Sequence, residues 1–164
     1  MSGPLSGKVA FISGGSRGIG RANALTLAGA GADVAIPYYN SHEEAESVCE
    51  EIRGMGRKSM PVQADISNSK TVDEALEEFE TEFDRVDLVV SNAALRGLKP
   101  ATDMTLKHFP NREHLLEEYK TRTPLGPTLV PEQVADAIYL LCLPESAMIT
   151  GPTLFVDGGY AISG

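Results

Sequence analysis

The residues of this chain whose spacing most clearly predicts chemistry form a glycine-rich stretch near the N-terminus. Gly14, Gly18 and Gly20 follow the apolar residues 9–12 and precede an alanine-rich segment. A strand, a glycine loop and a helix in this order are typical of a dinucleotide site, because the helix directs free N–H groups and its positive dipole end at the phosphates. We expect Gly14 to take the positive φ of a tight turn, Gly18 to let the main chain approach the pyrophosphate, and Gly20 to let the helix pack closely. The loop residues predicted to bind the cofactor are Gly14, Ser16, Arg17, Gly18, Ile19 and Gly20.

Arg17 and the residues after the second predicted strand indicate which dinucleotide binds. A carboxylate about 20 residues beyond the loop, at the end of that strand, would bind the ribose 2′-hydroxyl of NAD(H). This chain has none there, since Asp33 begins the strand and Tyr39 and Asn40 follow it. The guanidinium of Arg17 can instead pair with a 2′-phosphate through its forked donors. The sequence therefore predicts NADP(H) as the cofactor, with NAD(H) less favoured, and Tyr39 and Asn40 as part of the site.

Hydrophobic periodicity predicts the elements that must position these residues. Apolar runs alternate with segments in which apolar residues recur at helical spacing. The alternation implies right-handed crossovers and a parallel sheet with helices on both faces, a Rossmann-like α/β fold. The expected strands cover residues 9–12, 33–36, 59–63 and 86–90, and the expected helices cover residues 19–30, 41–53 and 71–83.

Local signals predict where these elements end. We expect Pro37 to end the second strand. Ser41 followed by Glu44 has the spacing of a capping box, and Thr71 is expected to cap the third helix. Residues 86–90 are apolar apart from one aspartate, which predicts a strand covered on both faces.

Candidate ligand-binding segments gather at one edge of the expected sheet. Ligands bind such sheets beside the carboxyl ends of the strands. The segments that fall at those ends are residues 14–20, 38–41, 65–66 and 92–94.

These segments resemble the short-chain dehydrogenase/reductase family. Residues 13–20 resemble its cofactor loop, with serine in place of the usual threonine at the first position. Asp65 and Ile66 stand where the family holds the adenine, and residues 91–94 stand where it has an Asn-Asn-Ala-Gly turn under the cofactor. Asn40 stands where NADP-using relatives often carry a second basic residue, so a modest affinity is expected. The resemblance implies further cofactor-binding roles for Asp65, Ile66, Asn92 and Ala93.

The C-terminal third resembles a different part of the same family. Pro110 interrupts what looks like the approach to the family's central helix, and the residues after it are similar to the family's C-terminal region. The similarity is greatest to the third type of enoyl-acyl-carrier-protein reductase. A helix is expected to begin at Pro131, and residues 149–159 are expected to form a final strand and turn. The resemblance implies an oxidoreductase that reduces a keto or enoyl thioester.

The segment that would carry the family's catalytic Ser and Tyr-x-x-x-Lys is missing between the two matching parts. None of the tyrosines is followed four residues later by lysine. Tyr119 and Lys120 are no replacement, because adjacent residues of a helix point about 100° apart. We therefore predict no catalytic residue in this sequence and a fold truncated by the loss of the central strands and helices.

Three readings remain open from the sequence. The chain is a reductase with an unidentified proton donor, or it is a catalytically inactive nucleotide-binding or partner subunit. Alternatively, the sequence is incomplete through an engineered deletion or an omitted middle. The presence or absence of a tyrosine and lysine pair separates the first two readings.

Length and composition limit the number of domains, the kinds of partner and the state of the cysteines. With 164 residues we predict a single domain, whose nucleotide-binding half covers residues 1–109 and whose last helices and strand cover residues 110–164. A net charge of -9 disfavours nucleic acid and anionic membranes as partners. The histidines have no ligand-like partners at metal spacing, so no metal site is expected. Cys49 and Cys142 are expected to be free thiols in a reducing cytoplasm.

The truncated sheet also predicts self-association. A sheet without its usual neighbours leaves parallel edges and an apolar face open, and such surfaces favour pairing with another chain. We expect a homo-oligomer that forms through residues 134–141 and 153–156.

Overall fold

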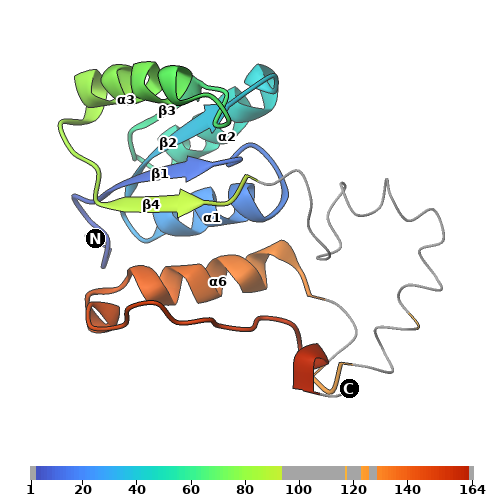
Figure 1. Ribbon diagram of the computed structural model, residues 1–164. Coiled ribbons are helices and arrows are strands. Elements are labelled where there is room, and N and C mark those ends of the chain that lie inside the picture. The colour runs from blue at the N-terminus through green and yellow to red at the C-terminus, as the bar shows by residue number, and fades with distance from the viewer. Residues whose placement is uncertain (1–2, 94–116, 118–122, 126–128, 163–164) are drawn as a thin grey trace. The chain divides into compact units, whose positions relative to one another are not determined.

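A parallel sheet of four strands occupies the N-terminal part of the chain (Figure 1). The strands are β1 (Val9–Ser13), β2 (Asp33–Tyr38), β3 (Ser59–Gln63) and β4 (Leu88–Ser91). They lie in the order β3-β2-β1-β4, and every neighbouring pair is parallel. Both the order and the direction agree with a doubly wound α/β sheet.

The computed structural model describes residues 3–93, 117, 123–125 and 129–162. The chain divides into two units, Met1–Leu95 and Arg96–Gly164. The sheet belongs entirely to the first unit. The boundary predicted at residue 109 lies outside the described residues and stays a prediction.

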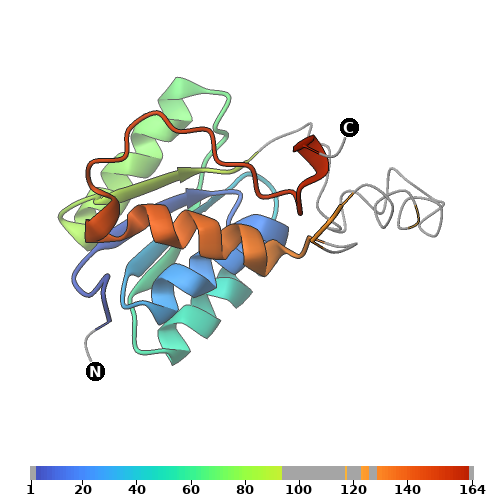
Figure 2. The same ribbon diagram turned by 90° about the horizontal axis from the view of Figure 1, so that it is seen from below.

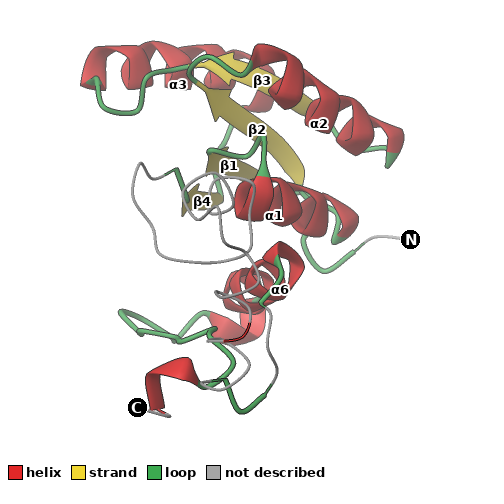
Figure 3. Cartoon of the chain, turned by 90° about the vertical axis from the view of Figure 1, so that its right-hand side faces the viewer, coloured by secondary structure: helices red, strands yellow, loops and turns green. Residues whose placement is uncertain are grey.

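Helices cover both faces of the sheet. They are α1 (Gly18–Gly29), α2 (His42–Gly54) and α3 (Ser69–Phe83). Figure 2 and Figure 3 show α3 on one side of the sheet and α1 with α2 on the other. The predicted Rossmann-like architecture is confirmed for this unit.

The core of the first unit has one layer on each side of the sheet. On the α3 side, Phe11 of β1 packs edge-to-face on Phe79 with 5.7 Å between ring centroids, and Phe79 stacks on Phe83. Side chains alternate along a strand, so Ile12 and Ile36 point to the α1 and α2 side. Each is fully buried, which ties both helices to the strands that end at the glycine loop.

Two predicted element ends are wrong. β2 continues through Pro37, which pairs with Val62 of β3. Proline is tolerated because β1 pairs with β2 only as far as Ala35, so the missing N–H has no ladder partner to lose on that side. Helix α3 begins before Thr71, because Asn68 is its N-cap and accepts a hydrogen bond from the Lys70 N–H at 3.0 Å.

The predicted burial of the fourth strand is also wrong. Strand β4 pairs only with β1 in the described sheet, and the side chain of Val89 is 71% exposed. Helices α1, α2 and α3 make their main contacts with the other three strands. The position of β4 at the edge of the sheet therefore leaves its apolar residues uncovered by the helices of the first unit.

The described residues of the second unit include the helix α6 (Pro131–Cys142), which begins at Pro131 as predicted. Short 3₁₀ turns follow at Pro144–Ser146 and Tyr160–Ile162. The predicted last strand is not formed, because residues 152–156 pair with no strand among the described residues. The predicted turn after it is present, with Asp157 accepting hydrogen bonds from the N–H groups of Gly159 and Ala161. Within the described part of the chain, no helix has the length and apolarity needed to cross a membrane.

Candidate cofactor site

The glycine loop between β1 and α1 leaves the start of the helix free for an anion. Gly14 has φ +66° and Gly18 has φ +54°, so both adopt the left-handed conformation that favours glycine. Arg17 is the N-cap of α1, yet its side chain makes no capping hydrogen bond. The first turn of α1 also holds no acidic residue. The unshared N–H groups and the helix dipole thus face no competing negative charge from this helix.

Gly20 sits where the helix presses on the loop. A Cβ atom at this position would lie 2.1 Å from the carbonyl oxygen of Gly14 and 2.6 Å from Nδ2 of Asn92. No side chain fits at those distances without moving backbone atoms. The close approach expected for Gly20 is therefore a requirement of this junction.

A hydrogen-bond network ties the glycine loop to the end of β4. The hydroxyl of Ser13 accepts from the N–H groups of Asn92 at 3.0 Å and Ala93 at 3.1 Å. In return, Nδ2 of Asn92 donates to the carbonyl oxygens of Ser13 at 3.1 Å and Gly14 at 3.3 Å. The sequence analysis assigned no role to Ser13, although a hydroxyl at the end of an apolar strand and directly before the first glycine could have indicated one. The network fixes the backbone on which a phosphate would rest.

Arg17 approaches the beginning of α2. Its Nη2 lies 3.5 Å from the hydroxyl oxygen of Ser41, and the Arg17 side chain is exposed. Ser41 is the N-cap of α2 but makes no side-chain capping bond, so the capping box predicted with Glu44 is wrong. The hydroxyl is directed to the guanidinium instead. Ser41 is therefore a candidate site residue that the sequence reading placed only in a structural role.

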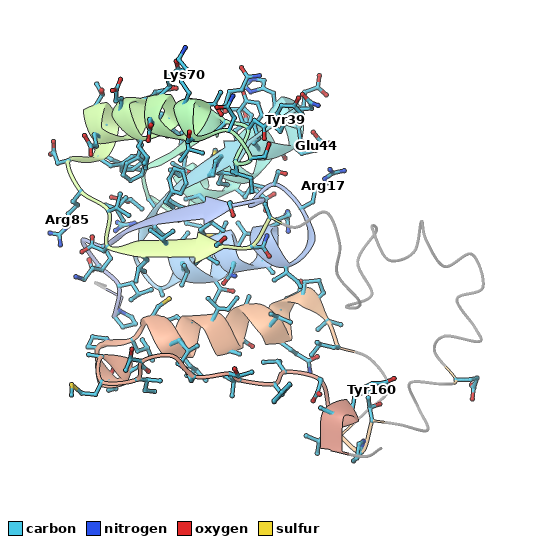
Figure 4. All side chains as sticks on the ribbon, viewed as in Figure 1. Arg17, Tyr39, Glu44, Lys70, Arg85 and Tyr160 are labelled. Carbon is cyan, nitrogen blue, oxygen red and sulfur yellow. The ribbon has the colours of Figure 1, made fainter. Side chains whose placement is uncertain are left out.

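The charges near α2 are mixed. Glu43 and Glu44 lie in its first turn, where they stabilise the helix dipole. Figure 4 shows Arg17, Tyr39 and Glu44 at the same end of the strands. Two carboxylates therefore lie in the first turn of the helix whose N-cap Arg17 contacts. 

The ends of β2 and β3 lie next to each other. The N–H of Ala64 donates to the carbonyl oxygen of Tyr38 at 2.8 Å, one residue beyond the last ladder pair. Tyr39 is 61% exposed and Ile66 is 48% exposed. Exposed aromatic and aliphatic side chains at adjacent strand ends are suited to hold a flat base.

Asp65 is fixed within its own turn. Its Oδ1 accepts hydrogen bonds from the N–H of Ser67 at 2.9 Å and from the Ser67 hydroxyl at 2.7 Å. These two bonds hold the pKa of the Asp65 carboxyl below its ordinary value. The carboxylate is therefore charged and oriented at neutral pH.

The predicted site residues all follow the carboxyl ends of the strands. Contacts join Asn92 to the glycine loop and Arg17 to Ser41, whereas Asp65 bonds within its own turn. Among the residues that the structure describes, no group of acids, histidines and cysteines could hold a metal ion. Tyr119 and Lys120 lie outside the described residues.

Two family profiles match the chain. The profile described as short chain dehydrogenase matches residues 8–113, and the profile described as Enoyl-(Acyl carrier protein) reductase matches residues 101–161. The first covers all four strands of the sheet and the second covers α6.

Curated relatives match the N-terminal part. A hydroxynaphthalene reductase of Aspergillus fumigatus is 43% identical over 106 residues, which is 65% of this chain and 39% of the relative. A 3-oxoacyl-acyl-carrier-protein reductase of Staphylococcus epidermidis is 42% identical over 88 residues, or 54% of this chain and 36% of the relative. The chain thus spans 39% of the length of the first relative and 36% of the length of the second.

Solved structures have the same fold. A 3-ketoacyl-acyl-carrier-protein reductase from Brucella melitensis, complexed with NADH, superposes with a TM-score of 0.76 at 26% identity, over 96% of this chain and 100% of that chain. A metagenomic blue fluorescent protein in complex with NADPH gives 0.78 at 22% identity, over 96% and 99% of the two chains, which is evidence for the fold alone. With the profile match over residues 8–113, these findings show that the chain belongs to the short chain dehydrogenase family.

Proposed function

We propose that this chain binds NADP(H) at the carboxyl edge of its sheet. The observation that carries the proposal is the contact between Arg17 and Ser41 beside a glycine loop whose helix start is free of acids. A guanidinium and a hydroxyl are both donors, and together they suit the 2′-phosphate that distinguishes NADP(H) from NAD(H). Asp33 cannot select NAD(H), because its Oδ1 accepts from the Lys58 N–H at the opposite end of β2.

The residues present fit the parts of the cofactor. The pyrophosphate would rest on the N–H groups at the start of α1, where Gly14 and Gly20 allow close approach. The adenine would lie between Tyr39 and Ile66, beside Asp65. Asn92 would keep the loop in shape under the nicotinamide half, through its bonds to Ser13 and Gly14. When bound, the nicotinamide supplies or accepts a hydride.

We propose that the reaction this chain inherits from its family is the reduction of a keto or enoyl thioester, which it would perform only with a proton donor other than the family's tyrosine and lysine pair. Relatives named as reductases of acyl-carrier-protein substrates and the second family profile support this substrate class. We further propose a cytoplasmic location, which the free Cys49 and Cys142 support.

A second candidate function is cofactor binding without turnover. The sequence contains no Tyr-x-x-x-Lys, so the tyrosine and lysine pair that would protonate the substrate oxygen is absent from it. The chain would then act as an inactive nucleotide-binding or partner subunit.

Nucleotide titration of the wild type and of Arg17→Ala tests the proposed function. We expect the wild type to bind NADPH more tightly than NADH. Loss of a charge-assisted contact of about 1.5–3 kcal/mol would weaken NADPH binding about 10- to 150-fold and leave NADH binding nearly unchanged.

Arg21→Ala is the matched control. Arg21 lies on the same helix and pairs with Glu51 of α2 at 2.7 and 2.8 Å, outside the glycine loop. It should retain the preference for NADPH. Equal affinities of the wild type for the two nucleotides would refute the proposed role of Arg17.

A further inference from the structure

The sheet ends in two edge strands whose residues differ. Strand β3 pairs with β2 and strand β4 pairs with β1, and neither pairs with a second strand in the described sheet (Figure 1). An exposed edge carries backbone N–H and C=O groups that can bond to a strand of another chain. The residues at each edge decide which of the two is open to such pairing.

A proline blocks the edge at β3. The Val34 N–H donates to the Lys58 carbonyl, and the Ala64 N–H donates to a carbonyl of β2, so the even-numbered residues bond to β2. Because backbone groups alternate in direction along a strand, the nitrogen of Pro61 faces the outer edge. A residue without an N–H in the middle of an edge strand is one way in which proteins prevent pairing with another chain.

The edge at β4 has no such block. The Ser13 hydroxyl donates to the Val90 carbonyl oxygen at 3.4 Å and accepts from the Asn92 N–H at 3.0 Å, so the even-numbered residues face β1. The N–H and C=O groups of Val89 and Ser91 therefore face the outer edge. Strand β4 contains no proline and no charged residue. Nothing in its sequence opposes a further strand.

The distribution of charge favours this edge for contact between two copies of a chain with net charge -9. Helices α2 and α3 are rich in glutamate, and they make their main contacts with the strands other than β4. Approach through those helices would bring like charges together, whereas approach through β4 brings uncharged strands together. Beside β4, the Asp87 carboxylate is already paired with Lys8 and Arg85.

We propose that the β4 edge is a docking surface for β4 of a second copy, in the antiparallel direction, about a two-fold axis through Val90. In this register Val89 of each copy exchanges N–H···O bonds with Ser91 of the other, so the groups that face the edge are paired. Val90 then lies opposite Val90 of the second copy, and such β-branched pairs stabilise a sheet. This pairing does not depend on NADP(H) binding.

The bonds already made by Asp87 favour this register. An axis through Val89 would set Ser91 opposite Asp87 of the second copy. The Asp87 N–H already donates to the Val9 carbonyl oxygen at 2.9 Å, so it is not free to bond across the axis. The axis through Val90 leaves that bond intact.

Analytical ultracentrifugation of the wild type, Val89→Pro and Val89→Lys tests the docking surface. Val89 is 71% exposed and its N–H faces away from β1, so proline there removes no bond to β1. We expect Val89→Pro to raise the dissociation constant of the dimer about 5- to 150-fold, because each copy loses one N–H donor to the other. Val89→Lys should also weaken the dimer, because it brings two cations to the axis. Both variants should keep the circular dichroism of the wild type.

Phe155→Lys is the matched control. Phe155 is an apolar residue of the second unit with a similar exposed fraction, 69%. Its replacement should leave the dissociation constant within about twofold, as for a site outside the interface. An interface through residues 153–156 is the competing outcome. A dimer that Phe155→Lys dissociates and Val89→Lys does not would overturn the proposal.

Disulfide cross-linking tests the register. Directly opposite residues of a non-hydrogen-bonded pair have Cα atoms about 4.5 Å apart, within reach of a disulfide, whereas diagonal neighbours are about 7–8 Å apart and beyond it. With Cys142 replaced by serine, Val90→Cys should form a covalent dimer under mild oxidation and Val89→Cys should not. Cross-linking through Val89→Cys alone, no cross-linking through Val90→Cys, or a wild type that stays monomeric at high concentration would each overturn the proposal.

Discussion

Asp87 shows how one side chain sets the stability of the edge between β1 and β4. Its carboxylate is 8% exposed and accepts from Lys8 Nζ and from the Val9 N–H, each at 3.0 Å, and also from Arg85. Burial alone would raise the pKa of this carboxyl. The bonds from Arg85, Lys8 and Val9 outweigh burial and lower the pKa below its ordinary value.

The lowered pKa predicts a loss of stability in acid. The charged carboxylate stabilises the folded chain above the unfolded-state pKa of about 3.9, and this contribution disappears as the pH falls through the lower folded-state pKa. As the pH falls below about 5, we expect protonation of Asp87 to lower the free energy of unfolding by about 1–3 kcal/mol. Urea unfolding of the wild type and of Asp87→Asn at several pH values measures the effect.

Asp87→Asn is expected to be less stable than the wild type at pH 7 and to show a shallower decline in acid. Asn keeps an acceptor for the Val9 N–H but loses the charge that Lys8 and Arg85 neutralise. Parallel pH curves for the two proteins would contradict the assignment.

At the scale of elements, repeated patterns were predictable and single contacts were not. Helix α1 and strand β3 lie within one residue of their predicted bounds, because several apolar residues report the same period. The capping box predicted at Ser41 is not formed, because Arg17, distant in sequence, bonds to the Ser41 hydroxyl. The extent of β2 beyond Pro37 was missed because it depends on where the neighbouring strand stops pairing.

Gly20→Ala and Gly29→Ala form a matched pair on helix α1. A Cβ at Gly20 would overlap the Gly14 carbonyl oxygen at 2.1 Å, whereas nothing lies within 4 Å of a Cβ at Gly29. We expect Gly20→Ala to destabilise the chain by at least about 2 kcal/mol and to abolish NADPH binding. Gly29→Ala should stabilise it by up to about 1 kcal/mol, because alanine favours the helix.

Denaturant unfolding and NADPH titration of both variants provide the measurement. The identical chemical change separates the effect of the close contact from any general effect of alanine. Retained NADPH binding by Gly20→Ala would show that the junction can open to admit a methyl group.

At the scale of the whole molecule, the sequence predicted those parts of the fold whose neighbouring elements are present in the chain. The parallel sheet and the edge that carries the site followed from motifs within residues 8–92. The predicted coverage of β4 and the predicted last strand both failed, because each depends on neighbouring strands that the described sheet does not contain. A run of apolar residues forms a strand only where a neighbouring strand is available to pair with it.

We predict that copies of the chain associate. Val89 on β4 is 71% exposed, and in the second unit Phe155 and Met148 are 69% and 93% exposed. Apolar side chains of this size in water favour contact with another copy. Light scattering at high concentration should give a mass above 17.5 kDa, and a clean monomer would contradict the prediction.

We also predict that this chain does not reduce thioesters at an enzymic rate. A positioned general acid contributes about 10²- to 10⁴-fold, and this sequence lacks the tyrosine and lysine pair that would supply it. Oxidation of NADPH with acetoacetyl and crotonyl thioesters, followed at about 340 nm, is expected to stay near background. Turnover of about one per second, lost in Gly18→Ala, would reveal a catalytic residue outside the family pattern.

The pairing of β1 with β4 has a consequence for how the chain folds. The contacts at this edge, from Lys8 to Asp87 and from Ser13 to Asn92, join residues 79 positions apart. Contacts between β1 and β2 and between β2 and β3 close much shorter loops, and long loops carry a larger entropic cost. The edge that braces Gly14 should therefore form last, so that the ability to hold a dinucleotide appears only at the end of folding.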